Sequence, residues 1–231
     1  MTASGGAGRD TTLGARHDLI VAAQSRAWAG PFPPLANPDA AHDAAVLILF
    51  GALDNIPAPG EKPAVARDLD VLLQRRAPSL SSHPGQVSFP GGRRDPGDTD
   101  LIATALREAE EETGLDPDGV EILSTLPALP LAASNHLVTP VLGWWAAPSR
   151  VVAVDHAETV EVFRTPVAQL LDPTNRFTSV LHRDDFVFRG PAFDVDGTIV
   201  WGFTAMVLDG IFTAAGWTTP WDAGRERSIR A

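Results

Sequence analysis

The apolar residues of this chain occur mostly in short continuous runs, which is the pattern of buried strands. The clearest run covers residues 44–53 (AAVLILFGAL) and is rich in strand-forming side chains. A second strand is expected at 69–73, where two arginines, Arg75 and Arg76, follow directly. Shorter apolar runs predict further strands at 86–89, 120–126, 137–144, 159–163, 177–181, 186–188 and 198–200.

Two segments show helical spacing instead. In residues 98–113 the apolar side chains recur every three or four positions and form one stripe, with Asp98 or Thr99 able to cap the start. Gly114 follows at the place where a left-handed residue ends a helix. A more apolar helix is predicted at 203–215, and shorter helices within 15–30 and at 166–171.

These elements predict one folded domain over residues 41–217, built on a mixed sheet with few helices. Residues 15–40 are expected to hold an N-terminal helix and a proline-rich lead-in. Residues 1–14 are rich in Gly, Ala and Thr and predict a disordered tail, and residues 218–231 predict a C-terminal tail.

The composition excludes several kinds of functional site and binding partner. The 231 residues include no Cys and no Tyr, which excludes disulfides, thiolate metal sites and a Cys or Tyr nucleophile and suits a reducing cytoplasm, the expected location. The net charge of −11 argues against binding nucleic acid or an anionic membrane surface. No apolar run approaches the roughly 20 residues that span a bilayer. Because the chain is negatively charged overall, binding an anionic substrate would need a local cation, either a metal or clustered arginines.

The chemistry is concentrated in residues 91–115 (GGRRDPGDTDLIATALREAEEETGL). On a helix, Glu108, Glu111 and Glu112 lie on one patch, where their charges repel and raise each other's pKa. Mg²⁺ or Mn²⁺ would relieve that repulsion, because both prefer oxygen ligands. A solvated acidic helix end is the alternative for the glutamates alone. The glycine turn before the helix, and Arg107 placed to orient a carboxylate, favour a metal site.

This stretch resembles the Nudix box, whose pattern is Gly, five residues, Glu, seven residues, then Arg-Glu-apolar-x-Glu-Glu-x-Gly-apolar. Two departures are visible: Asp98 stands for the early Glu, and eight residues rather than seven separate it from Arg107. The residues that match the box are Gly92, Arg107, Glu108, Ala109, Glu111, Glu112, Gly114 and Leu115.

The longer box resembles that of one Nudix branch, the coenzyme A pyrophosphatases, which also carry a signature just upstream. Two signature positions depart here, since Gln74 stands for a Thr and Ser81 for an Arg. His83 and Gln86 are similar to the common bacterial form. The matching positions are Arg76, Ala77, Gly85, Phe89, Pro90, Gly91 and Gly92.

The resemblance implies an α+β Nudix fold, a mixed sheet sandwiched between helices (α/β/α). It also implies hydrolysis of coenzyme A or acyl-coenzyme A to adenosine 3′,5′-bisphosphate and (acyl-)4′-phosphopantetheine. Glu108 and Glu112 would bind Mg²⁺ or Mn²⁺, and Glu111 would be the third ligand or the general base. Arg107 would orient a carboxylate. A homodimer is a further expectation from the family.

Four residues are candidates for substrate binding. Arg76 is the first, because a guanidinium suits phosphate, and His83 would contact a phosphate or stabilise its loop. Gly91 and Gly92 would allow an unusual turn or a close approach of substrate.

Two other functions stay open. The same chemistry could act on another nucleoside diphosphate derivative, such as a dinucleotide or a nucleotide sugar. A non-catalytic Nudix module that binds a nucleotide and regulates a partner is the alternative of a different class. Such a module is expected to lose its carboxylates, and this chain keeps all three.

Overall fold

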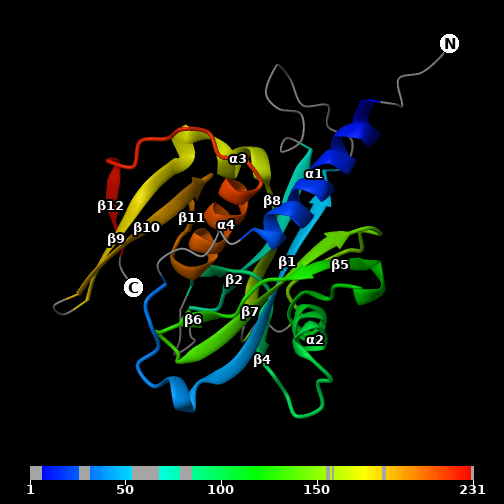
Figure 1. Ribbon diagram of the computed structural model, residues 1–231, viewed down its shortest axis with the longest axis horizontal. Coiled ribbons are helices and arrows are strands. Elements are labelled where there is room, and N and C mark those ends of the chain that lie inside the picture. The colour runs from blue at the N-terminus through cyan, green and yellow to red at the C-terminus, as the bar shows by residue number, and fades with distance from the viewer. Residues whose placement is uncertain are drawn as a thin grey trace.

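The computed structural model describes residues 7–25, 32–53, 68–78, 85–154, 157, 159–183 and 186–229, and it contains two sheets with helices around them (Figure 1). The strands of the eight-stranded sheet are β1 His42–Ala52, β2 Leu69–Arg76, β3 Val87–Ser88, β4 Gly91–Arg93, β5 Val120–Thr125, β6 Leu129–Leu131, β7 His136–Trp145 and β8 Thr159–Pro166. The four-stranded sheet holds β9 Arg176–Arg183, β10 Phe186–Val195, β11 Thr198–Val200 and β12 Glu226–Ser228. The α-helices are α1 Ala7–Gln24, α2 Leu101–Thr113, α3 Val167–Leu171 and α4 Gly202–Ala214, and three single turns are η1 Pro38–Ala40, η2 Pro117–Gly119 and η3 Pro173–Asn175.

The centre of the large sheet is a fork between β1 and β2. The two strands pair antiparallel only near one end, where Phe50 lies opposite Val71. Farther along, β4 pairs with β1, with Gly91 opposite Val46, and β3 pairs with β2. The β3–β4 segment therefore fills the gap where β1 and β2 diverge. This arrangement brings its glycine pair into the interior of the sheet.

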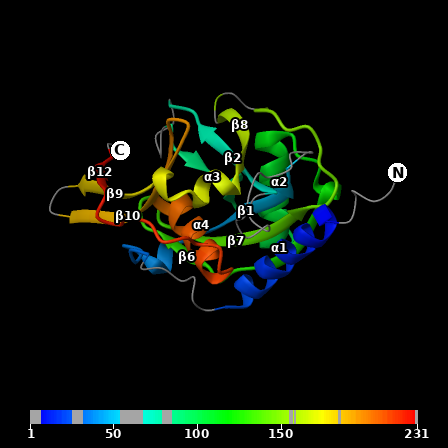
Figure 2. The same ribbon diagram turned by 90° about the horizontal axis from the view of Figure 1, so that it is seen from above.

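Helices cover both faces of this sheet. Because residues of β1 point alternately to opposite sides, they enter two different apolar clusters. Leu47 and Leu49 share a buried apolar cluster with Ala105 and Ala109 of α2. The intervening Ile48 and Phe50 belong to a second cluster, with α4 side chains among its members: Ala205, Val207, Leu208, Ile211 and Phe212. Figure 2 shows α2 and α4 on opposite sides of the strands. The predicted mixed sheet between helices is confirmed, and its parallel pair is β1 with β7.

The chain ends are more structured than the pattern predicts. Helix α1 begins at Ala7, inside the stretch expected to be a disordered tail. Strand β12 lies in the expected C-terminal tail and pairs in parallel with β9, Glu226 opposite Thr178. Its sequence, ERS, carries no apolar signal, so only the neighbouring strand defines it. The strands β4, β6 and β12 were not predicted, and the strands divide between two sheets rather than one.

The described part of the chain contains no helix that is both long and apolar enough to cross a membrane.

Candidate active site

Helix α2 is fixed firmly at both ends. Asp100, rather than the predicted Asp98 or Thr99, caps its start, accepting the Ala103 N–H at 2.8 Å. At the other end Gly114 takes a left-handed φ of 67°. The extended chain after β7 then satisfies the last carbonyls, through a hydrogen bond of 3.1 Å from the Val154 N–H to the Glu112 carbonyl. Glu112 thus lies in the last turn of the helix, which these contacts hold in place.

The Glu112 carboxylate is buried, with 5% of the residue exposed. Its Oε2 accepts two N–H groups, one from Gln74 Nε2 at 2.6 Å and one from the Gly91 backbone at 2.9 Å. Burial, with a smaller contribution from the negative charge of Glu108, nevertheless raises the Glu112 pKa to about 7. A nearby cation would stabilise the charged form of this side chain.

The glycine pair in the fork meets the carboxylates directly. Gly91 has a φ of 152°, and a Cβ there would lie 2.3 Å from the Ala45 carbonyl oxygen. A Cβ on Gly92 would lie 2.5 Å from the carboxyl carbon of Glu108. Only glycine therefore lets the backbone reach Glu112 and lets Glu108 approach it. Both glycines were predicted to bind substrate or form a turn; here they shape the carboxylate site.

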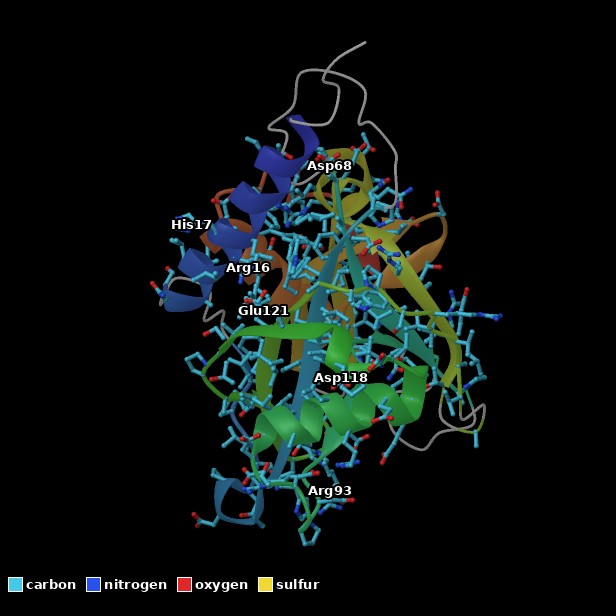
Figure 3. All side chains as sticks on the ribbon, turned by 90° about the vertical axis from the view of Figure 1, so that its right-hand side faces the viewer. Arg16, His17, Asp68, Arg93, Asp118 and Glu121 are labelled. Atoms are coloured by element: carbon cyan, nitrogen blue, oxygen red, sulfur yellow. The ribbon has the colours of Figure 1, made fainter. Side chains whose placement is uncertain are left out.

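Arg107 joins the other acidic side chains. Its Nε and Nη2 bind the two oxygens of Asp98, each at 3.0 Å. Its Nη1 donates to Glu108 at 2.9 Å and to Glu111 at 3.0 Å, and Nη2 also reaches the Arg93 carbonyl at 3.1 Å. Hydrogen bonding to Asp98 keeps the pKa of Arg107 above its already high ordinary value. Arg107 thus contacts the carboxylates of Asp98, Glu108 and Glu111. Figure 3 shows Arg93 labelled beside α2.

Asp98 binds Arg107 although the box is one residue longer than the family pattern. Its carboxylate accepts the Asp95 N–H at 2.8 Å and the Thr104 hydroxyl at 2.9 Å in addition to the Arg107 pair. The hydrogen bond from Arg107 holds the Asp98 pKa well below its usual range. Asp98 lies in the loop just before α2, and it reaches Arg107 although its side chain is shorter than the family's glutamate and one position farther away.

The two arginines after the second predicted strand point to opposite faces of the sheet. Arg76 lies half-buried on the α2 side, where its charge lowers the Glu112 pKa, and its buried Nε has no hydrogen-bond partner among the described residues. Arg75 faces away, pairing with Glu161 at 3.3 Å and donating to Thr198 at 3.0 Å. The predicted His83 lies outside the described residues.

The three box glutamates differ in exposure and are held by different partners. The side chain of Glu111 is 59% exposed and that of Glu108 is 17% exposed, whereas Glu112 is buried. Among the described residues, no group of three or more His, Asp or Glu side chains is arranged to hold a metal ion by itself. Mg²⁺ is commonly bound through one or two carboxylates, with water and phosphate oxygens completing its shell. Glu108 and Glu112, four residues apart on one helix face, fit that smaller ligand set.

Three residues of the site were not predicted to belong to it. In the sequence, Asp98 is a possible helix cap and the counterpart of a family position, and Gln74 is a departure from a signature. Thr159, whose hydroxyl donates to Gln74 at 3.2 Å, was not singled out. The available signal was the polarity of Gln74 inside the run LDVLLQRR, because a buried amide requires partners.

The comparisons with known proteins agree on one family. The NUDIX domain model matches residues 63–183, which is just over half of the chain. A protein of Pectobacterium atrosepticum named "Uncharacterized Nudix hydrolase NudL" is 37% identical over 138 residues, covering 60% of this chain and 71% of that protein. Its namesake from Yersinia pestis strain Pestoides F is 36% identical over 139 residues, covering 60% of this chain and 68% of its own.

Solved structures similar to this chain include the Nudix hydrolase RenU of M. smegmatis, with a TM-score of 0.43 and 25% identity over 57% of this chain and 74% of that one. The NUDIX domain of Shewanella oneidensis NrtR, complexed with ADP ribose, has a TM-score of 0.42 and 24% identity, covering 57% of this chain and 77% of its own. On the family model and the curated relatives, together with the box residues gathered around the glycine fork, we conclude that this chain belongs to the Nudix family of hydrolases.

Proposed function

We propose that this Nudix hydrolase cleaves the diphosphate bond of coenzyme A or acyl-coenzyme A with the help of Mg²⁺ or Mn²⁺. The products would be adenosine 3′,5′-bisphosphate and (acyl-)4′-phosphopantetheine. The observation that carries the metal-dependent chemistry is the buried Glu112, whose charge is opposed by burial and by Glu108. The choice of substrate is supported by the resemblance of residues 72–92 to the coenzyme A pyrophosphatase signature.

In this proposal Glu108 and Glu112 hold the cation. When bound there, a divalent cation neutralises diphosphate oxygens and lowers the pKa of an attacking water. Arg107 keeps Glu108 and Glu111 in place by charge-assisted hydrogen bonds of 2.9 and 3.0 Å. No covalent nucleophile is required, because diphosphate hydrolysis depends mainly on positioning and electrostatics.

Glu111 is the candidate general base or third ligand. Its side chain is mostly exposed, and Arg107 donates to only one of its oxygens, Oε2. The Oε1 atom can then accept a proton from water. The variant Glu111→Gln separates the two roles: a base loses kcat with unchanged Mn²⁺ affinity, whereas a ligand loses Mn²⁺ affinity too.

Arg76 is the candidate contact for the substrate phosphates. It lies on the same face of β2 as Gln74, two residues away along the strand, and its buried Nε has no partner among the described residues. The residue as a whole is only half-buried, and its guanidinium N–H groups suit an anionic oxygen of the substrate. We expect Arg76→Gln to raise KM for the substrate more than it lowers kcat.

The test is direct. The purified protein is incubated with coenzyme A and Mg²⁺ or Mn²⁺, beside a panel of dinucleotides and nucleotide sugars, and the products are separated by chromatography. Metal-dependent release of adenosine 3′,5′-bisphosphate, faster than turnover of any panel compound and abolished by EDTA, supports the proposal. Turnover of the panel without cleavage of coenzyme A would transfer the proposal to another nucleoside diphosphate derivative. Inactivity on every compound would favour a nucleotide-binding regulatory module.

A further inference from the structure

Gln74 is a polar side chain in the most buried part of strand β2. It is fully buried, with an exposed fraction of 0%, and its neighbours Leu72 and Leu73 belong to the apolar clusters on the two faces of the sheet. Burying an amide is costly unless both of its ends are hydrogen-bonded. Here both ends are: Nε2 donates to Glu112 at 2.6 Å, and Oε1 accepts from the Thr159 hydroxyl at 3.2 Å.

The contacts of Gln74 join separate parts of the chain at one carboxylate oxygen. Gln74 approaches Glu112 Oε2 from β2, and the Gly91 N–H approaches the same atom from the fork at 2.9 Å. Two N–H groups on a single oxygen restrict rotation of the carboxylate about its last bond. The second oxygen, Oε1, is then presented in a single orientation.

Thr159 determines which way round the Gln74 amide sits. An ionised carboxylate only accepts hydrogen bonds, so the amide NH₂ must face Glu112 and its carbonyl must face away. The Thr159 hydroxyl supplies the donor that this carbonyl needs. Thr159 is itself 1% exposed and is held by strand pairing, opposite Arg76.

We propose that Gln74, aligned by Thr159, is a positioning residue that orients the Glu112 carboxylate for cation binding. The inference rests on the function proposed above, because it assigns Glu112 to the metal. It also accounts for the departure from the upstream signature at position 74, where the longer glutamine spans the distance from β2 to α2.

The experiment measures Mn²⁺ affinity from the electron paramagnetic resonance signal of free Mn²⁺, beside kcat and KM. Gln74→Met keeps an unbranched side chain of similar length and removes the donor. We expect Mn²⁺ affinity to fall by about 10- to 100-fold, as is typical when a partner of a metal ligand is lost. The loss of kcat should be recovered at high Mn²⁺ concentration, with KM for the substrate unchanged.

Thr159 provides a matched pair of variants. Thr159→Ser keeps the hydroxyl and should bind Mn²⁺ as the wild type does, whereas Thr159→Val should bind it more weakly. Because Thr159 acts through Gln74, adding Thr159→Val to Gln74→Met should cause no further loss of affinity. Denaturant unfolding in EDTA is measured in parallel to confirm that each variant folds.

Several results would overturn the inference. One is an unchanged Mn²⁺ affinity in Gln74→Met, and another is an equal loss in Thr159→Ser and Thr159→Val. Full additivity in the double variant would mean that the two residues act separately, as general packing residues do. A wild-type protein that neither binds Mn²⁺ nor hydrolyses a diphosphate would contradict the proposed function itself, which distinguishes that failure from the failure of this inference.

Discussion

Two buried charges lie on opposite sides of the large sheet, and they are held by different kinds of partner. Arg176 of β9 is fully buried and meets a counter-charge, Asp209 of α4, with the rings of Phe193 and Trp221 at 5.2 and 4.6 Å from its guanidinium carbon. Glu112 of α2 receives two N–H groups, and no ion pair among the described residues includes it.

The difference separates a structural charge, Arg176, from the charge that we propose to be functional, Glu112. The chain supplies the counter-charge of Arg176 permanently, and that pair joins the small sheet to helix α4. At Glu112, burial and the neighbouring negative charge of Glu108 raise the pKa to about 7, although the two neutral donors and the charge of Arg76 lower it. A buried charge that forms no ion pair within the described residues is therefore the better marker of a candidate active site. The following predictions test this contrast, from the largest expected effect to the smallest.

Neutralising Glu112 should have the largest effect on activity. Glu112→Gln preserves the shape and the two N–H contacts but removes the negative charge that holds the cation. We expect kcat/KM for metal-dependent hydrolysis to fall on the order of 100- to 10,000-fold, since a metal contributes several kcal/mol to charge stabilisation. Initial rates over a series of Mg²⁺ concentrations measure this. A variant within a few-fold of the wild type would remove Glu112 from the metal site.

Neutralising Asp209 should instead affect stability. Asp209→Asn leaves the buried guanidinium of Arg176 without its counter-charge, which costs about 3–5 kcal/mol in unfolding free energy. Mn²⁺ affinity should be unchanged in the fraction that remains folded. Urea unfolding measures the loss. The double variant Arg176→Met/Asp209→Asn should be more stable than Asp209→Asn alone, because it no longer buries an unpaired charge; the opposite order would contradict the structural role.

The contrast also predicts a pH dependence in the absence of metal. The ordinary pKa of Glu112 is 4.5, and in the fold it is raised to about 7. Between these values the folded chain binds more protons than the unfolded chain at this site, so the free energy of unfolding falls as pH rises. The full loss is about 3 kcal/mol at 1.36 kcal/mol per pKa unit. Asp98, whose pKa is lowered, acts in the opposite direction at lower pH.

Glu112→Gln isolates this contribution, because every other titrating group is shared with the wild type. Unfolding curves in EDTA at several pH values from 4.5 to 7.5 should show the variant gaining stability relative to the wild type as pH rises. Adding Mn²⁺ at pH 7.5 should reverse the difference, since only the wild type gains a bound cation. A constant difference across this range would show that Glu112 is not desolvated in solution.

Features that depend on neighbours in sequence were predictable. The α2 carboxylates share a helix face because of their spacing, and Arg107 reaches Glu108 and Glu111 within the same helix. The contact of Gln74 with Glu112 joins residues separated by 38 positions, and it depends on how far β1 and β2 diverge. Apolar patterning does not encode that register. The same reason hides β12, which is polar in sequence and is defined only by its pairing with β9.

The smallest predicted effect concerns the glycine that faces Glu108. Gly92→Ala would place a Cβ 2.5 Å from the Glu108 carboxyl carbon, at the end of a side chain that can move away. The fold should therefore tolerate the change, with little shift in Tm, while the displaced carboxylate lowers kcat/KM by about 100-fold or less. Gly97→Ala is the matched control, because a Cβ there meets no atom within 4 Å. If both alanine variants lost activity equally, or if Gly92→Ala lost stability rather than activity, the glycine would serve the fold and not the position of Glu108.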